Sequence, residues 1–144
     1  MQIEEEVKPK VEKLMSSKRK NMGDALGIEF KLFSRDEMQA TMPVDKNTIQ
    51  PFGILHGGAS VALAETLASV GAFLNLTDPS KIAVGLEINA NHIKPVQLGE
   101  VVTGIAKPIH RGATTQVWET RIITETKKLV CISRCTLAVV KKRN

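Results

Sequence analysis

The chain has 144 residues, of which 42% are hydrophobic, so it can form one domain with a real core and is too apolar to be disordered. Its formal net charge is only +5 and its aromatic content is 3%, with no tyrosine, which argues against a nucleic-acid-binding surface that stacks bases. This mild basicity better suits a small polyanionic ligand.

The first 22 residues are predicted to form a helical appendage to a main domain that spans residues 23–144. Apolar residues recur on one stripe between residues 3 and 22, although Pro9 is unfavourable for a helix beyond its first turn. The acidic N-terminus differs from a secretion signal, which would be basic and then apolar. We therefore expect a cytoplasmic protein.

Alternating apolar and polar residues predict a β-hairpin from residues 26–33 and 37–43, followed by a loop over residues 45–53. An almost entirely apolar stretch, residues 59–76, predicts a long helix that other structure encloses on all sides. Because this stretch contains Glu65 and several smaller polar residues, we interpret it as a buried helix and not as a membrane span.

Four strand-like runs follow, at residues 82–94, 99–110, 114–125 and 129–140. Two strands, a long apolar helix and four more strands predict an α+β fold in which an antiparallel sheet curves around a central helix. Because six strands around a helix cannot close into a barrel, the sheet has edges, and such edges favour pairing with a second subunit. We therefore expect at least a dimer.

The two cysteines are predicted to remain reduced. Cys131 and Cys135 lie four residues apart in a strand-like run, which separates their Cα atoms by about 13 Å. That separation is too large for a disulfide bond. Two reduced cysteines without an export signal also favour the cytoplasm.

Glu65 is the first candidate for chemistry in this sequence. It lies in the middle of the apolar helix, where an ionised carboxylate is costly unless partners compensate its charge. A glutamate in mid-helix is most often a solvated surface residue, but the small and apolar neighbours of Glu65 argue against solvation here. Ser69, one turn further on, could form a hydrogen bond with the carboxylate or position a water molecule.

His56-Gly57-Gly58 opens the helix, without the Ser, Thr or Asp that usually caps a helix start. The first N–H groups are therefore expected to be free, with the positive end of the helix dipole behind them. Such a site could stabilise the oxyanion that develops on a carbonyl group. The alternative is that the two glycines only ease a tight turn into the helix.

Two further histidines lie in positions of interest. By alternation, His92 shares the inward face of its strand with Val84 and Ile88, so we expect it to point toward the core or a cleft. It is either a core histidine bonded to the backbone or a site residue. His110-Arg111-Gly112, at a turn between strands, is either solvated or able to hold a phosphate group.

Other common chemistries fit the sequence poorly. The three histidines lack the short spacing of metal ligands and the two cysteines lack a second pair, so no metal site is expected. The sequence has no Gly-rich phosphate loop of the nucleotide-binding types and no elbow motif for a serine nucleophile.

The segment from Gln50 to Ser69 closely resembles the hot-dog-fold acyl-CoA thioesterases (the PaaI-like, 4-hydroxybenzoyl-CoA thioesterase superfamily). Within them it is similar to the branch that includes 1,4-dihydroxy-2-naphthoyl-CoA hydrolases and the proofreading thioesterases of enterobactin synthesis. The resemblance covers roughly residues 27–140 and continues through the segments around His92, His110 and Trp118. It implies a single hot-dog domain that hydrolyses an acyl-CoA, with an aromatic acyl group, to the free acid and CoA without a cofactor.

The resemblance also implies catalytic roles at matching positions. Glu65 corresponds to the catalytic carboxylate, which acts either as a nucleophile through an anhydride or as a general base on water. The N–H of Gly57 would donate to the oxyanion, while His56 would help to orient the thioester carbonyl. Gln50 would contact the carbonyl or the lytic water, and Ser69 would position that water.

The remaining implied positions bind the substrate. His92 would line the acyl end. The positions that would face the pantetheine and phosphates of CoA are Gly85, Lys94, Pro95, His110, Arg111, Gly112, Ala113, Thr114 and Thr115. In this family the glutamate meets the thioester across a subunit boundary, which implies a homodimer and, beyond it, a homotetramer built as a dimer of dimers. Neither a nucleic acid nor a membrane is implied as a partner.

The sequence leaves two other functions open. One is an acyl-thioester dehydratase or hydratase of the same fold, although those enzymes begin the central helix with a different loop. The other is a non-enzymatic acyl-CoA-binding module, which would bind without turnover and would normally carry an output domain, for which residues 1–22 are too short. The acyl group and the carrier, either CoA or a pantetheinylated protein, also stay open.

Overall fold

The computed structural model describes residues 1–143 of the chain. The strands are β1 (Gln2–Ile3), β2 (Glu29–Phe33), β3 (Met38–Pro43), β4 (Lys81–His92), β5 (Val101–Arg111), β6 (Thr115–Thr124) and β7 (Leu129–Lys141). The helices are α1 (Lys8–Met15), α2 (Met22–Leu26) and α3 (Gly57–Leu74). The bounds of α3 and of the four long strands β4 to β7 lie within two residues of those predicted.

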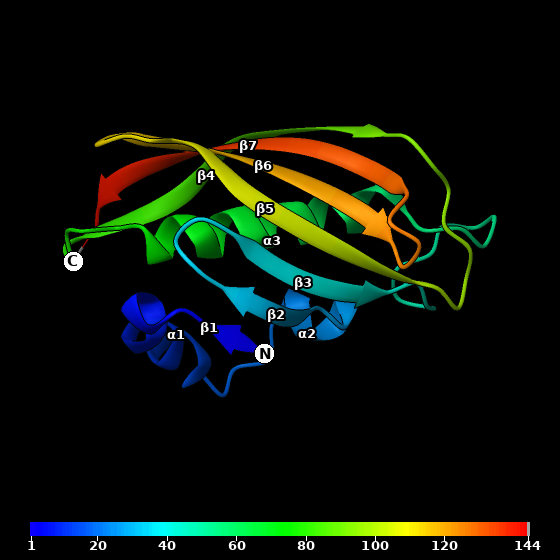
Figure 1. The fold of residues 1–144 in the computed structure, drawn as a ribbon, viewed down its shortest axis with the longest axis horizontal. Coiled ribbons are helices and arrows are strands. Elements are labelled where there is room, and N and C mark those ends of the chain that lie inside the picture. The colour runs from blue at the N-terminus through cyan, green and yellow to red at the C-terminus, as the bar shows by residue number, and fades with distance from the viewer. Residues whose placement is uncertain (144) are drawn as a thin grey trace.

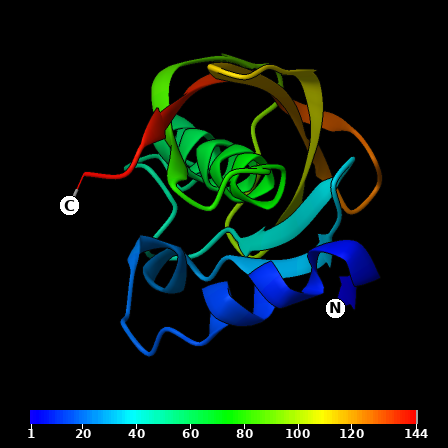
Figure 2. The same cartoon turned by 90° about the vertical axis from the view of Figure 1, so that its left-hand side faces the viewer.

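One sheet arches around α3, from β4 on one side to β2 on the other (Figures 1 and 2). The strand order is β1-β2-β3-β5-β6-β7-β4, and only the two-residue strand β1 pairs in parallel. This arrangement confirms the predicted α+β fold, in which an antiparallel sheet wraps around a central helix. The short strand β1 is an addition to the six strands predicted.

The concave face of the sheet packs closely against α3. A Cβ atom on Gly71 of α3 would lie only 2.6 Å from the ring of Trp118, so glycine lets the indole approach the helix. The indole N–H donates to Gln116, whose side-chain amide donates to the carbonyl of Ala72 at 3.3 Å. Among residues 1–143, α3 alone has the length and hydropathy of a membrane span, but it is half-buried inside the fold, as the predicted core helix should be.

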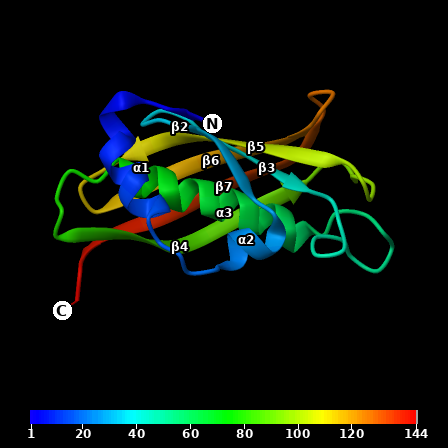
Figure 3. The same ribbon diagram turned by 90° about the horizontal axis from the view of Figure 1, so that it is seen from below.

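The expectation that α3 is enclosed on all sides is wrong for a single chain. Leu63, Ala64 and Leu67 face the sheet and are fully buried. The opposite side of the helix is only half-buried, and its residues there are Val61, Ala62, Glu65, Thr66, Ser69 and Val70. The sheet covers one side of α3, and the short helices α1 and α2 lie on the other side (Figure 3).

The prediction of one helix over residues 3–22 is also wrong. A 3₁₀ turn at Glu5–Val7 leads into α1, which has Pro9 in its first turn, where proline is tolerated because its missing N–H would have no helical acceptor. The chain then loses regular structure until Asn21, whose side chain caps α2 through Gly23 and Asp24. The boundary predicted after residue 22 therefore falls at the start of α2.

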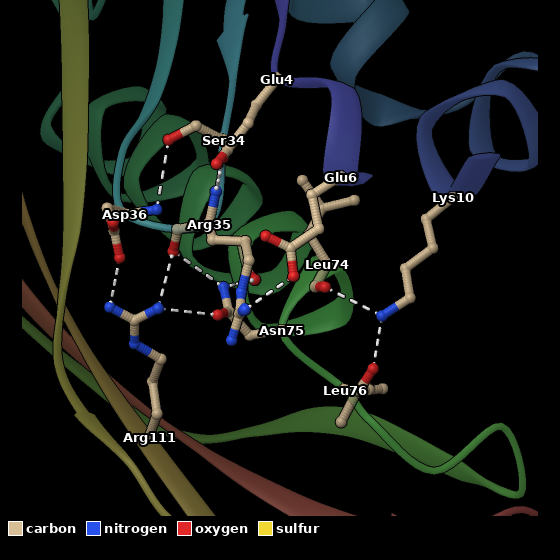
Figure 4. Close-up of polar contacts among 11 residues, drawn as sticks. Glu4, Glu6, Lys10, Ser34, Arg35, Asp36, Leu74, Asn75, Leu76 and Arg111 are labelled. Carbon is tan, nitrogen blue, oxygen red and sulfur yellow. Dashed lines mark hydrogen bonds and ion pairs between the residues drawn. The ribbon is translucent and has the colours of Figure 1, made fainter. Parts of the chain in front are cut away.

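The first 15 residues dock onto the C-terminal end of α3 (Figure 4). Val7 and Val11 are buried in the core. The ammonium group of Lys10 donates to the carbonyl of Leu74 at 2.9 Å and to that of Leu76. A cation at this position satisfies free carbonyls and interacts favourably with the helix dipole. The appendage thus holds the C-terminal end of α3, the helix that also carries Glu65 near its middle.

The strand β4 forms one edge of the sheet and, within residues 1–143, pairs with β7 alone. It is 12 residues long, and its apolar residues Val84 and Leu86 are 41% and 63% exposed. The predicted sheet edges are therefore present. A long edge of this kind with exposed apolar residues is a template for pairing with another strand.

Candidate active site

Glu65 lines an open cleft of ≈ 410 Å³ on the half-buried side of α3. The other residues that line the cleft are Met22, Ala62, Thr66, Ser69 and Val70. Among residues 1–143, the Glu65 carboxylate has no hydrogen-bond or ion-pair partner, and the predicted bond to Ser69 is not present. A carboxylate that is held beside a largely apolar cleft without a partner is available to a ligand.

Gly85, on the edge strand β4, lies directly against this carboxylate. A Cβ atom at position 85 would come within 2.5 Å of a Glu65 carboxylate oxygen. Sequence resemblance placed Gly85 beside the CoA pantetheine, and the structure places it against the Glu65 carboxylate. A glycine inside a strand often marks such a close approach, but the sequence does not say what approaches.

The cysteine nearest to the cleft is not available as a thiolate. Burial, together with the negative charges of Glu65 and Glu87, raises the pKa of the Cys135 thiol to about 11. Burial also raises the pKa of Cys131. Both thiols are free, as predicted, and both are buried. At neutral pH they stay protonated, and a protonated thiol is a poor nucleophile.

At the start of α3, the structure corrects the prediction that the first N–H groups are all free. The imidazole Nδ1 of His56 accepts from the N–H of Gly58 at 2.8 Å, so a histidine acts as the helix cap. The His56 carbonyl accepts from Ala59 and Ser60. Within the described residues, only the N–H of Gly57 is left without an acceptor in this first turn, where the helix dipole favours negative charge.

A second cleft, of ≈ 330 Å³, opens at Gly57. It brings together five residues that were proposed separately from the sequence: Gln50, Gly57, His92, Lys94 and Pro95. A Cβ atom on Gly57 would lie 2.8 Å from His92 Nε2, so the histidine covers the helix start. His92 is exposed, which excludes a core histidine and leaves the cleft position that the sequence allowed.

Gly57 and Glu65 do not meet within one chain. They are eight residues apart on α3, which separates them by about 12 Å along the helix axis. They also line two different clefts. One carbonyl group therefore cannot contact both residues of the same chain.

The turn between β5 and β6, residues 110–115, lies at the opposite end of α3 from Gly57. The Arg111 guanidinium donates to the Asn75 side chain at 2.9 Å and to the Arg35 carbonyl, and it pairs with Asp36 (Figure 4). This cation, which resemblance placed on the CoA phosphates, is thus already bound to protein groups. Within a single chain, the turn is far from Lys94 and Pro95.

The variant Gly85→Ala is expected to displace the Glu65 carboxylate, which the sequence resemblance implies to be catalytic, and to lower kcat/KM about tenfold or more, because small misplacements of a reacting group are costly. The backbone conformation at Gly85 suits an L-residue, and the group that must move is the end of a flexible side chain. The fold should therefore survive. Thiol release from an acyl thioester and the melting temperature are measured together.

Asn91→Ala on the same strand serves as the control, since Asn91 does not line either cleft. Gel filtration of both variants shows whether the edge of β4 still pairs normally. A Gly85→Ala enzyme with full activity, or one that loses activity only because it dissociates, would contradict the contact between Gly85 and the carboxylate as a determinant of turnover.

The antiparallel sheet that arches around a central helix has the hot-dog architecture, and the comparisons with known proteins place the chain among the thioester hydrolases with that fold. The model of the thioesterase superfamily matches residues 52–131. The chain is 50% identical over 120 residues to the 1,4-dihydroxy-2-naphthoyl-CoA hydrolase of Listeria monocytogenes, covering 83% of this chain and 96% of that protein. It is 47% identical over 115 residues to the proofreading thioesterase EntH of Cronobacter turicensis, covering 80% and 82%.

Among solved structures, the thioesterase HI1161 of Haemophilus influenzae superposes with a TM-score of 0.81 at 50% sequence identity. The superposition covers 91% of this chain and 88% of that one. The chain therefore belongs to the thioesterase superfamily and is a thioester hydrolase with the hot-dog fold.

Proposed function

We propose that this protein hydrolyses an acyl-CoA with an aromatic or medium-size acyl group, in the cytoplasm, with Glu65 as the catalytic carboxylate. The observation that carries the proposal is the Glu65 carboxylate, which has no partner within residues 1–143 and lies beside an open, mostly apolar cleft. The names of the relatives support the choice of CoA as the carrier. The reaction needs no metal or organic cofactor, because a carboxylate and an oxyanion donor suffice for thioester hydrolysis.

The chemistry follows one of two routes from the same carboxylate. As a general base, Glu65 takes a proton from water while the water oxygen attacks the thioester carbon. As a nucleophile, its oxygen attacks that carbon to give an anhydride, which water then hydrolyses. In both routes negative charge moves to the carbonyl oxygen, where the N–H of Gly57 stabilises it, and CoA leaves as the thiolate.

The other proposed site residues surround these two groups. Gln50 and His56 hold the thioester carbonyl at the Gly57 cleft, and His92 lines the acyl end. Ser69 lines the Glu65 cleft one helical turn further on and positions the attacking water. Lys94 and Pro95, beside Gly57, contact the pantetheine arm.

The active site is shared between two subunits, because Gly57 and Glu65 of one chain are too far apart to serve one carbonyl. In a two-fold dimer with antiparallel helices, an axis near Val61 brings Gly57 of one chain opposite the partner's Glu65. Gly57 touches His92, and Glu65 touches Gly85, both on β4. The same axis therefore passes near the middle of β4 and pairs the two free edges into one sheet.

A homodimer is thus the smallest active unit of this proposal, and two dimers associate into a homotetramer. The residues His110, Gly112, Ala113, Thr114 and Thr115 contact CoA only if another subunit brings that turn to a cleft. No nucleic acid or membrane takes part.

Thiol release from benzoyl-CoA, octanoyl-CoA and acetyl-CoA tests the proposal. Hydrolysis of benzoyl-CoA or octanoyl-CoA with kcat/KM at least about tenfold above that for acetyl-CoA is expected, because burial of apolar acyl surface stabilises the bound ester. Binding of these thioesters without thiol release would instead indicate an acyl-CoA-binding module. Hydration of an enoyl-CoA without thiol release would indicate the hydratase function.

A further inference from the structure

A third cavity, of ≈ 440 Å³, lies between the N-terminal segment and α3, and we call it the appendage pocket. Its apolar side chains are Leu14, Met15, Phe30, Phe33 and Val70. Leu14 and Met15 are 38% and 54% exposed, so they present apolar surface that the chain itself does not cover. Small-molecule sites commonly have this size and combine apolar side chains with polar groups that fix the orientation of the ligand.

Three consecutive cations line the same pocket, namely Lys18, Arg19 and Lys20. All three are exposed, and within residues 1–143 their side chains make no ion pair or hydrogen bond. The pocket has one acidic residue, Asp24, whose carboxylate already accepts from the N–H of Asn21 at 2.8 Å. The rim therefore carries an excess of positive charge, which favours an anionic group on the ligand.

The appendage pocket adjoins the cleft of the proposed catalytic carboxylate. Thr66 and Val70 line both spaces. Asn21 lines the pocket, and its neighbour Met22 lines the cleft. A group bound at Glu65 can therefore extend past Thr66 and Val70 into the pocket without crossing the body of the protein.

We infer that the appendage pocket binds the far end of the acyl group, and that its three cations select acyl groups that end in a carboxylate. This inference rests on the proposed acyl-CoA hydrolysis and specifies its substrate class. The substrate has an apolar acyl chain of medium length, which lies along Val70 and Met15. Its terminal carboxylate pairs with the residues from Lys18 to Lys20.

The position of the pocket favours the acyl end of the substrate over the phosphates of CoA. The whole pantetheine arm separates those phosphates from the thioester carbon that Glu65 serves. The pocket, in contrast, begins at Thr66, the residue next to Glu65. The acyl chain leaves the thioester carbon directly, so its end reaches the pocket first.

The test compares octanoyl-CoA with suberyl-CoA, its counterpart with a terminal carboxylate, and uses benzoyl-CoA as a short acyl group. In the variant Lys18→Glu/Lys20→Glu, the ratio of kcat/KM for suberyl-CoA to that for octanoyl-CoA should fall about tenfold, because attractive charges become repulsive. The kcat/KM for benzoyl-CoA should change less than about twofold, since its acyl group carries no anion to repel. Added salt should lower the wild-type ratio as well.

Lys8→Glu/Lys13→Glu is the matched control, because it changes the net charge equally within the same appendage but outside the pocket. This control should keep the wild-type ratio. The inference would be overturned if Lys18→Glu/Lys20→Glu left the ratio of kcat/KM values unchanged, or if it lowered kcat/KM equally for all three substrates. An equal fall in kcat/KM together with a changed elution volume in gel filtration would identify these lysines as a subunit contact. If wild type hydrolyses none of the three thioesters, the proposed function itself fails.

Discussion

Replacing Glu65 with alanine is expected to lower kcat/KM for benzoyl-CoA at least ~100-fold, the scale of removing a positioned acid–base group. The carboxylate faces an open cleft and has no partner within residues 1–143, so its removal breaks no bond that holds the fold together. Leu63 and Leu67, on the buried side of α3, keep their packing. Initial rates of thiol release and a melting curve are measured on the same preparation.

Glu65→Gln tests the role of the negative charge alone, since glutamine keeps the shape of the side chain and removes the charge. This variant should bind acyl-CoA without turning it over and should melt within a few degrees of wild type. Glu87→Gln is the matched control, because Glu87 is an exposed carboxylate that does not line the cleft. Wild-type rates in Glu65→Ala would remove Glu65 from the mechanism, and unfolding of Glu65→Gln would make its role structural.

The long elements could be predicted from the sequence because their patterns are strongly periodic. The alternation in β5 to β7 and the apolar run of α3 fix each element within two residues. The N-terminal segment could not be predicted in the same way. Its apolar stripe ends at Met15, and residues 16–21 are all polar, so no apolar face continues the helix there. The cap at Asn21 then starts a new helix.

The site was only partly predictable for a related reason. A charged residue within an apolar run, Glu65, and two glycines at a helix start, Gly57 and Gly58, are local features, so the sequence alone indicated them. The contact of Gly85 with the carboxylate joins two distant segments, and no pattern within either segment encodes it. His56 was missed as a helix cap because histidine is not among the usual capping residues.

Arg111 is a residue for which the sequence predicted a ligand contact and the fold supplies a protein partner. Beside a turn, an arginine indicates a phosphate contact, but its partner Asp36 lies 75 residues away in the chain. Only the fold brings the β2–β3 turn, the end of α3 and this cation together (Figure 4). A charge that the sequence suggests is free can therefore already be engaged in a structural contact.

Mixing two inactive variants is expected to restore activity, because each proposed active site is built from two chains. Gln50→Ala removes a polar group from the Gly57 cleft and should lower activity about 100-fold, the scale reported for loss of one oxyanion-hole donor. Glu65→Gln inactivates the other cleft. In a mixed dimer of these two variants, one site receives both substitutions, whereas the other receives Gln50 from one chain and Glu65 from its partner and is intact.

Random association makes half of the dimers mixed, and each mixed dimer has one intact site of two, so about one quarter of wild-type activity should return. This fraction is the same whether or not dimers pair into tetramers. Mixing each variant with itself under the same conditions provides the control. Gel filtration confirms that the subunits have reassociated.

Thiol release by the co-refolded mixture of Glu65→Gln and Gln50→Ala therefore tests most directly whether a carboxylate from one chain serves a thioester held by another. If each site is built from two subunits, the mixture should recover about one quarter of the wild-type rate from two nearly inactive parents. A mixture that is no more active than the mean of its parents, although dimers have formed, would contradict it.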